Sequence, residues 1–337
     1  MLNKAIIDLS VLRENAKAIK EKLNEKTKFF AVVKADAYGH GAGKVANALY
    51  NIVDGFSVAT LEEGVALRLS GIDKQILVLI PMLKQDFARA IFYNLTITIE
   101  DYLSALAIEK ECQKQNRKAL VQIKFNSGMN RSGVSDLKLL NKMAEFITKS
   151  EYLVLDGAFS HFACPENKIQ LKSAQNKFLL ANNLIKGYNI KANCHISASG
   201  GFLNGVFMDA VRIGLLLYGY KPFKSDFVQV RPAMKVYAPV INSRKIFSGD
   251  GALYGLKKTE KDIDITLVRF GYADGLMRRE VKGQFNNRCM DSTAILGKKS
   301  GWVCVMDNAD HLAKKYDTIS YEILTKCALK AQKIYLN

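Results

Sequence analysis

The sequence predicts an α/β protein, with a (β/α)8 TIM-type barrel followed by a smaller, mainly β C-terminal domain. Strand-like runs alternate with helix-like stretches until the pattern stops at Tyr218. Eight such runs indicate parallel pairing, and eight strands close a barrel. An open doubly wound sheet is the main alternative, but it is disfavoured because no Gly-x-Gly-x-x-Gly follows the first strand of the alternation.

The individual elements follow from residue type and spacing. Residues 4–8 predict a short strand, and Ser10 is suited to cap a helix whose apolar positions fall on one face. The eight barrel strands are expected at residues 29–33, 55–59, 76–80, 95–99, 120–125, 153–159, 192–197 and 210–217. Helices are expected between them, among others at residues 61–70, 101–115, 136–148 and 167–185.

A change of composition marks the second domain. Pro222, Pro232 and Pro239 cluster after the last barrel strand, and three further strand-like runs are joined by glycine-containing turns. Those runs are residues 236–246, 263–270 and 293–296. We therefore expect the barrel over residues 9–220 and the β-rich domain over residues 221–337.

The charge balance and the cysteines argue against several classes of protein. There are 49 Lys and Arg against 32 Asp and Glu, a net charge of +17, but the scattered lysines disfavour a nucleic-acid partner. The six cysteines lack Cys-x-x-Cys spacing, so neither a metal site nor a disulfide framework is expected. Without a signal-peptide layout or a membrane-spanning apolar run, the sequence suggests a cytoplasmic enzyme with no membrane partner.

The strongest local signal for chemistry is the stretch from Ala31 to Gly41. Lys34 follows a buried apolar strand, where desolvation favours the neutral amine that condenses with an aldehyde. The glycines that follow let the backbone approach a bound group closely. A strand ending in a solvated lysine before a glycine-rich turn is the alternative interpretation.

Residues 33–41, Val-Lys-Ala-Asp-Ala-Tyr-Gly-His-Gly, resemble the pyridoxal-phosphate lysine motif of the alanine racemase family. Further motifs similar to that family follow in order along almost the whole chain. The resemblance implies pyridoxal 5'-phosphate on Lys34, racemisation of L- and D-alanine that supplies D-alanine for cell-wall peptidoglycan, and a homodimer with shared active sites. It also implies that the strand at residues 1–8 joins the β-rich domain.

Polar residues end or follow the predicted barrel strands, where barrels place their chemistry, and Arg212 lies in or beyond the eighth strand. They are Lys34, Lys124, Arg131, His161, His195, Ser199 and Arg212. The stretch from Lys124 to Arg131 resembles one in the family in which the arginine contacts the phenolic oxygen of the cofactor and the substrate carboxylate. The family lysine is often carbamylated, which turns repulsion between two cations into attraction. A plain surface residue is the alternative for Arg131.

The resemblance also assigns roles to His161 and Arg212. It implies a chain of hydrogen bonds from the catalytic tyrosine to His161 and on to Arg212, whose guanidinium faces the pyridine nitrogen. Because arginine does not give up its proton readily, that nitrogen stays unprotonated. His195 is a candidate orienting residue, with a satisfied core histidine as the alternative.

The phosphate site implied by the resemblance uses Tyr38, Ser199 and the backbone N–H groups of Gly214 and Leu215. The family usually has asparagine before the serine. Here that residue is Ala198, so one supporting contact differs.

Two motifs of the β-rich domain resemble parts of the family that reach the barrel of the partner subunit. One is a Gly-Tyr-Ala-Asp-Gly turn containing Tyr272, and the other is Cys289, Met290 and Asp291. The resemblance implies that Tyr272 is the second catalytic base and that Met290 lies in the loop that binds the substrate carboxylate. Lys34 and Tyr272 would then serve opposite faces of the substrate Cα. A turn tyrosine on the surface is the alternative.

The C-terminal stretch departs from the family, which ends with an Arg-Val-Pro-Arg-like segment after a tyrosine that contacts the phosphate. Here residues 330–333 are Lys-Ala-Gln-Lys, and Leu329 takes the place of the tyrosine by count. We expect weaker cofactor retention and a flatter preference for alanine, with Tyr321 or Tyr335 as the next candidates for the missing contact.

Four alternatives remain at this stage. A racemase of broader specificity, for example for serine, would share the scaffold and a small amino-acid substrate. A non-catalytic pyridoxal-phosphate-binding barrel is disfavoured by the motif around Tyr272, and a related decarboxylase is disfavoured by Arg212 opposite the ring nitrogen. A nucleic-acid-binding role driven by the net charge of +17 is the weakest.

Overall fold

The fold is known from a computed structural model that describes residues 2–188, 190–252, 254, 257–278 and 288–337. Contacts divide the chain into two compact units. The barrel unit is Leu12–Ala35 with Ala42–Arg231, and the β unit is Met1–Val11, Asp36–Gly41 and Pro232–Asn337. A short segment after Ala35 therefore groups with the β unit, although barrel residues flank it in sequence. The boundary expected between residues 220 and 221 stays a prediction.

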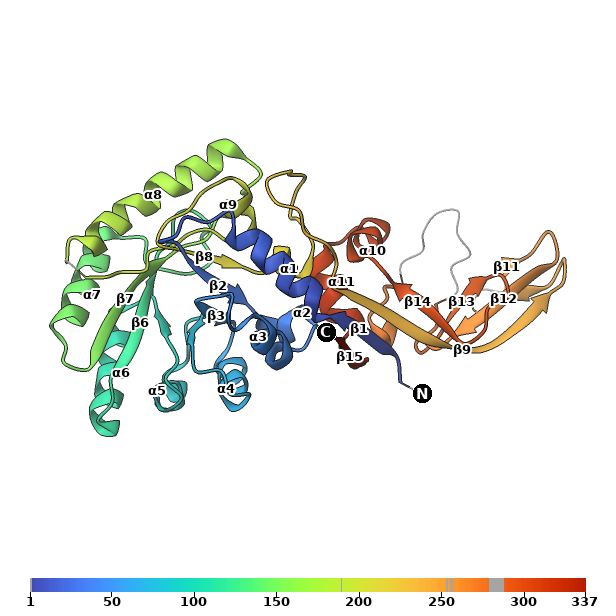
Figure 1. The fold of residues 1–337 in the computed structure, drawn as a ribbon, viewed down its shortest axis with the longest axis horizontal. Helices are drawn as coiled ribbons and strands as arrows, with labels where there is room; N and C mark the ends of the chain where they lie inside the picture. Colours follow the sequence, from blue (N-terminus) through green and yellow to red (C-terminus); the bar gives the residue numbers. More distant parts are fainter. Residues whose placement is uncertain (1, 189, 253, 255–256, 279–287) are drawn as a thin grey trace. The chain divides into compact units, whose positions relative to one another are not determined.

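The barrel unit is built from parallel strands, as expected. Two sheets have the orders β4-β3-β2-β8 and β5-β6-β7, and an isolated bridge between Leu77 and Thr96 joins β4 to β5. The strands are β2 (Lys28–Val32), β3 (Gly55–Val58), β4 (Gln75–Val78), β5 (Ile97–Ile99), β6 (Ala119–Lys124), β7 (Leu153–Phe159) and β8 (Ala210–Ile213). Figure 1 shows helices α4 to α8 on the outer side of these strands.

The prediction of a regular strand at residues 192–197 is wrong in detail. Among the described residues, this segment forms only an isolated bridge with β7, at His195. The His195 N–H donates to the carbonyl of Ala158 at 3.1 Å, and the Arg212 N–H donates to the carbonyl of Ser197 at 2.9 Å. The segment thus bonds to β7 on one side and to β8 on the other, which closes the ring of strands.

Backbone geometry explains this irregular strand and a second, shortened one. Gly157 in β7 has a φ of +146°, and a Cβ there would lie 2.4 Å from the carbonyl oxygen of Asn193. The two backbones approach too closely for a regular ladder. The strand expected at residues 210–217 ends at Ile213, because Gly214, with φ −116° and ψ −84°, leaves extended geometry and a 3-10 turn, η2 (Leu215–Tyr218), follows.

The predicted barrel helices are confirmed to within one residue at each end. They are α4 (Leu61–Leu69), α6 (Tyr102–Gln115), α7 (Leu137–Lys149) and α8 (Lys168–Lys186), accompanied by α1 (Leu9–Lys20), α3 (Ala42–Leu49), α5 (Phe87–Phe92) and α9 (Ser199–Leu203). Three start one residue late because Asp101, Asp136 and Asn167 are N-caps whose side chains accept hydrogen bonds from the first turn.

The β unit is a mixed sheet with the order β13-β12-β9-β1-β15, to which β14 adds by pairing with β9. Its strands are β1 (Lys4–Asp8), β9 (Met234–Ile246), β12 (Ile263–Val268), β13 (Thr293–Leu296), β14 (Trp302–Met306) and β15 (Gln332–Leu336). A short pair, β10 (Gly251–Ala252) and β11 (Lys257–Lys258), and the helices α10 (Ala309–Tyr316) and α11 (Ser320–Cys327) complete it. The N-terminal strand does join this sheet, antiparallel to β9 and parallel to β15.

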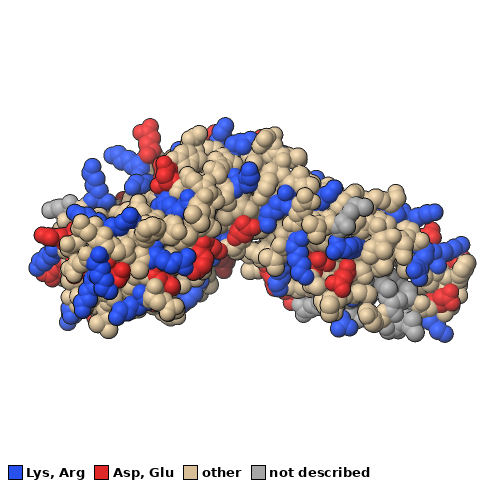
Figure 2. All heavy atoms as spheres, turned by 90° about the horizontal axis from the view of Figure 1, so that it is seen from below, with Lys and Arg blue, Asp and Glu red and all other residues tan. Residues whose placement is uncertain are grey.

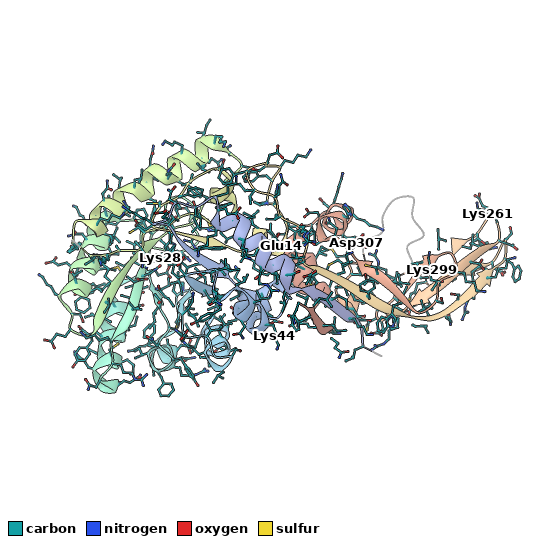
Figure 3. The ribbon with its side chains drawn as sticks, viewed as in Figure 1. Glu14, Lys28, Lys44, Lys261, Lys299 and Asp307 are labelled. Carbon is teal, nitrogen blue, oxygen red and sulfur yellow. The ribbon has the colours of Figure 1, made fainter. Side chains whose placement is uncertain are left out.

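Charged side chains are spread over the surface. On the face seen in Figure 2, Lys and Arg side chains are interspersed with Asp and Glu. The exposed Lys28, Lys44 and Lys261 come from three separate parts of the chain (Figure 3). In the described part of the chain, no helix combines the length and apolar character that crossing a bilayer requires.

Candidate active site

Lys34 lies at the start of a left-handed turn. Strand β2 ends at Val32, and Lys34 begins the next element, α2 (Lys34–Tyr38). The φ angles of the four residues after Lys34 lie between 51° and 54°. None of these residues is glycine, and left-handed backbone costs other residues roughly 1–2 kcal/mol each. Strain of this kind persists only where the surroundings enforce it.

Side chains of the β unit hold this turn. Asp36 forms an ion pair of 2.9 Å with Lys333 in β15, and the ring of Tyr38 lies 5.6 Å from the ring of Tyr321 in α11. Gly39 has a φ of +82°, and a Cβ there would lie 2.7 Å from the carbonyl oxygen of Leu324 in α11. The turn that follows Lys34 is therefore held by the C-terminal segment of the chain.

Four cations converge in the barrel unit. Burial, and then Arg131, lowers the pKa of Lys34, and the same two causes lower the pKa of Lys124 to about 8. Burial and Arg131 also lower the pKa of Arg212 to about 9. The acids that counter these shifts are Glu63 for Lys34 and Glu100 for Lys124. Like charges that share a low-dielectric site repel each other, so this cluster favours an anionic ligand.

His161 lies close enough to the same cations to interact with them electrostatically. Burial is the main cause that lowers its pKa to about 3, and Arg212 is the next. Its imidazole is therefore neutral near pH 7. The structure thus brings Lys34, Lys124, Arg131, His161 and Arg212 together, as the sequence predicts.

Arg212 makes different hydrogen bonds from those expected. Its guanidinium donates to the carbonyl of Ser160 at 2.6 Å and to Nδ1 of His195, and it lies over the ring of Phe159. Within the described residues its side chain bonds to His195 and not to His161. His195 has this role because it lies in the segment between β7 and β8, directly beside the strand that carries Arg212.

Two turns of the barrel unit carry the expected phosphate-binding groups. Ser199 begins α9 and is buried, and its Oγ accepts from the N–H of Leu216 at 3.4 Å. Leu216 lies in η2, directly after Gly214 and Leu215. The hydrogen bond therefore places the serine hydroxyl beside this turn. Tyr38, the remaining residue of the expected phosphate site, belongs to the β unit.

The two motifs of the β unit lie side by side. The Tyr272 N–H donates to the carbonyl of Cys289 at 3.2 Å, and the Ala273 N–H donates to the carbonyl of Met290 at 2.9 Å. Tyr272 begins the turn η3 (Tyr272–Asp274), the Met290 side chain is exposed, and Asp291 follows it. Backbone hydrogen bonds thus place the two motifs directly beside each other.

Leu329 does not take a buried position in the β unit. It follows α11 and is 75% exposed, whereas Tyr321 packs on Tyr38. Burial raises the pKa of Tyr321. Of the two tyrosines named as candidates for the missing contact, Tyr321 is therefore the one that stacks on the turn after Lys34. Tyr335 is the other, and its hydroxyl lies at Gly41.

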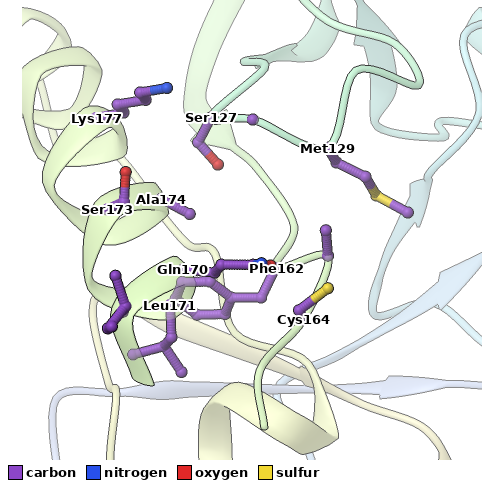
Figure 4. Close-up of a pocket in the computed structure, with 12 residues that line it drawn as sticks. Ser127, Met129, Phe162, Cys164, Gln170, Leu171, Ser173, Ala174 and Lys177 are labelled. Carbon is purple, nitrogen blue, oxygen red and sulfur yellow. The ribbon is translucent and has the colours of Figure 1, made fainter. Parts of the chain in front are cut away.

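A cavity of about 310 Å³ lies beside the loops that follow β6 and β7, and α8 forms its other wall (Figure 4). Ser127 and Met129 line it from the first loop, Phe162 and Cys164 from the second, and Lys177 from the helix. The sequence analysis did not predict this cavity. Its walls come from three separate elements, and no local pattern marks them.

Comparison with known proteins identifies the family. Residues 7–222 match the family described as alanine racemase, N-terminal domain, and residues 233–335 match alanine racemase, C-terminal domain. The chain is 32% identical to an alanine racemase of Streptococcus uberis, over 99% of this chain and 97% of that protein. It is 31% identical to alanine racemase 2 of Caldanaerobacter subterraneus, over 98% of this chain and 94% of that protein.

Solved structures agree with this result. An alanine racemase of Clostridium difficile has a TM-score of 0.93 and 30% identity, covering 100% of this chain and 96% of that one. A Bacillus anthracis alanine racemase with bound L-Ala-P has a TM-score of 0.90 and 28% identity, covering 99% of this chain and 95% of that one. The chain therefore belongs to the alanine racemase family of isomerases, and its fold is the barrel and β domain of that family.

Proposed function

We propose that this protein interconverts L- and D-alanine with pyridoxal 5'-phosphate held by Lys34. The observation that carries the proposal is the cluster of Lys34, Lys124, Arg131 and Arg212, in which burial and then Arg131 lower the pKa of the other three. Such a site favours ligands that bring phosphate, phenolate and carboxylate groups. The relatives named above as alanine racemases support the choice of alanine.

The residues present fit the cofactor. The lowered pKa of Lys34 increases the fraction of neutral amine, the form that bonds to an aldehyde. The buried hydroxyl of Ser199 lies beside the turn of Gly214 and Leu215, where hydroxyl and backbone donors suit a phosphate. When bound, pyridoxal phosphate supplies a conjugated ring that withdraws electron density from the substrate Cα.

The side chains of the protein then have separate roles in the reaction. The Lys34 amine moves a proton at one face of Cα, and the Tyr272 hydroxyl of a second copy moves a proton at the other face. Arg131 binds the substrate carboxylate, helped by the loop of Met290 from the second copy. Arg212 keeps its own proton near pH 7, because its pKa of about 9 lies above that value. With the cofactor bound, Arg212 would therefore donate a hydrogen bond to the ring nitrogen without transferring a proton to it.

A homodimer with shared sites is part of this proposal, as are a cytoplasmic location and the supply of D-alanine for peptidoglycan. Lys124 would carry a carbamate, which converts a cation beside Arg131 into an anion that attracts it. A second candidate is a racemase of broader specificity that also accepts serine. The sequence motivates this candidate, because Leu329 stands where the family has a tyrosine and so supplies no hydroxyl there.

Borohydride reduction tests the role of Lys34. Reduction of the purified holoprotein should fix the cofactor to the peptide that contains Lys34, as read by mass spectrometry after proteolysis. A label on a different lysine would contradict the assignment. The same preparation, incubated with a panel of L-amino acids and followed by chiral analysis, separates alanine preference from broader specificity.

Mixing two inactive variants tests the shared site. If Lys34 and Tyr272 act from different chains, mixed dimers of Lys34→Ala and Tyr272→Phe contain one site that lacks neither group. Some activity should therefore return on mixing. No recovery, with subunit exchange verified by tagged chains, would mean that both groups come from the same chain.

A further inference from the structure

A chain of hydrogen bonds runs across the barrel unit from the buried Arg212 to the half-buried Asp156. Nδ1 of His195 bonds to the Arg212 guanidinium, and Nε2 on the other side of the ring lies 3.0 Å from Oε1 of Gln122. Nε2 of Gln122 donates to Oδ2 of Asp156 at 2.6 Å. The Gln122 and His195 side chains are fully buried, and Arg212 is 3% exposed. None of the family motifs described above contains Gln122 or Asp156.

Arg212 and Asp156, the two ends of this hydrogen-bond relay, determine the direction of every hydrogen bond in it. Arg212 can only donate, so Nδ1 of His195 must be the acceptor and the ring proton must be on Nε2. That proton is donated to the Gln122 carbonyl, which turns the amide N–H towards Asp156. An ionised carboxylate can only accept, so the same orientation follows from the Asp156 end.

Asp156 is well suited to be the fixed end. Its Oδ2 also accepts from Gln75 at 2.7 Å, and its Oδ1 accepts from Asn193 at 2.6 Å. Three amide donors, from Gln75, Gln122 and Asn193, thus converge on this one carboxylate and fix its orientation. At the histidine, burial and Arg212 hold the pKa of His195 well below its ordinary value, so the ring is neutral and can accept at Nδ1.

We propose that Asp156 and Gln122 are positioning residues that, through one tautomer of His195, hold the Arg212 guanidinium in a single orientation. A relay of buried hydrogen bonds polarises its members and resists rotation of any one of them. The catalytic consequence rests on the proposed function, since it requires Arg212 to face the cofactor. The tautomer and its dependence on Gln122 and Asp156 do not rest on it.

Nitrogen-15 NMR of histidine-labelled holoprotein tests the proposal directly. The sequence has 4 histidines, so the spectrum is simple and His195→Gln assigns the signal. At about pH 7 we expect His195 to be neutral, with an unprotonated Nδ1 and a slowly exchanging proton on Nε2. A proton on Nδ1 in the wild-type protein would overturn the proposal whatever the variants do.

Two variants alter the hydrogen-bond relay at different residues. Gln122→Met removes the acceptor of the Nε2 proton, so that proton should lose its slow exchange. Asp156→Asn frees the Gln122 amide to flip and donate to Nε2, so a second His195 signal with the proton on Nδ1 should appear. Unchanged His195 signals in both variants would overturn the proposal. If Gln122→Met does not fold, the result with Asp156→Asn decides alone.

Gln75→Met is the matched control. Gln75 donates to the same oxygen of Asp156 as Gln122 does, and its other side-chain partner is Thr96, so it has no link to His195. The control should leave the His195 signals unchanged. It should also leave kcat unchanged, whereas Gln122→Met should lower kcat by about tenfold with little change in KM.

The outcomes separate this proposal from the proposed function. Equal effects of Gln75→Met and Gln122→Met on the His195 signals would show that Asp156 has only a structural role, and would overturn the proposal. If the NMR result is as expected but the protein does not racemise alanine, the hydrogen-bond relay is supported and only the proposed function is refuted.

Discussion

Lys34 and Arg212 are held in opposite ways. Lys34 stands before a left-handed turn of four residues, and that turn is enforced by α11 and β15 from the far end of the chain. Arg212 lies in a regular strand, and its side chain is fixed by hydrogen bonds to His195 and to the carbonyl of Ser160. The turn after Lys34 is thus held by side chains of α11 and β15, whereas the Arg212 side chain is held by a hydrogen-bond network inside the barrel unit.

This difference matches the work proposed for each residue. A lysine that bonds to a cofactor and moves protons needs a free side chain on a fixed backbone. The half-buried Lys34 side chain on an enforced turn meets that need. An arginine that sets the protonation of a ring needs a fixed side chain, and a buried network supplies that.

The largest effect is expected from Lys34→Ala. Removing the amine removes both the bond to the cofactor and one base, so racemisation should fall by at least about 10²–10⁴-fold. The measurement is D-alanine formed from L-alanine, read by chiral chromatography. Lys44→Ala, at an exposed lysine in α3, is the control and should keep full activity. Substantial racemisation by the Lys34 variant would rule out the lysine as a base.

The second-largest effect is expected on the stability of the left-handed turn after Lys34. Gly39→Ala places a Cβ 2.7 Å from the carbonyl oxygen of Leu324 at a φ of +82°. Overpacking of this kind adds about 1–3 kcal/mol to the cost of the backbone strain. Gly71→Ala is the matched control, because Gly71 has a φ of +86° with nothing within 4 Å of the new Cβ.

The difference between these two variants in denaturant unfolding isolates the contact with α11. We expect Gly39→Ala to be the less stable one and to lose bound cofactor more readily. Equal stabilities would mean that α11 moves away at little cost, and that the turn does not depend on it.

A smaller effect should come from pH acting on the cation cluster. In the folded protein the pKa of Lys124 is about 8, against an ordinary value of 10.5. Between those values the unfolded chain binds more protons, so the free energy of unfolding should rise with pH. Lys124→Met should remove on the order of 1 kcal/mol of that rise.

Unfolding by urea at a series of pH values measures this slope, in buffer freed of carbon dioxide so that Lys124 keeps its amine and carries no carbamate. Lys110→Met, at an exposed lysine in α6, is the control and should keep the wild-type slope. A slope for Lys124→Met identical to that of the wild type would mean that Lys124 keeps its proton in the cluster.

The smallest effect is expected at the ion pair between Lys333 and Asp36. The Lys333 side chain is 22% exposed and the Asp36 side chain 53%, so screening limits the pair to about 0.2–1 kcal/mol. A double-mutant cycle with Lys333→Gln and Asp36→Asn measures the coupling. The exposed pair of Lys149 and Glu145 provides the comparison and should couple more weakly. If the two pairs couple equally, the turn does not depend on β15 through this contact.

Features that neighbouring residues encode could be predicted from the sequence. Apolar runs and N-caps such as Asp101 and Asn167 specified the strands and helices, because period and capping are local properties. Local motifs also placed Lys34 and Arg131 after strands and Arg212 in the last strand, and a barrel of parallel strands brings these positions together.

Only the tertiary structure decided the features that depend on remote contacts. The left-handed turn after Lys34 is disfavoured locally, and Tyr321 and Lys333, about three hundred residues away, enforce it. The choice of His195 over His161 as the partner of Arg212 depends on which segment fills the gap between β7 and β8. Local propensity cannot specify either result, because the free energy that selects it comes from groups that meet only in the folded chain.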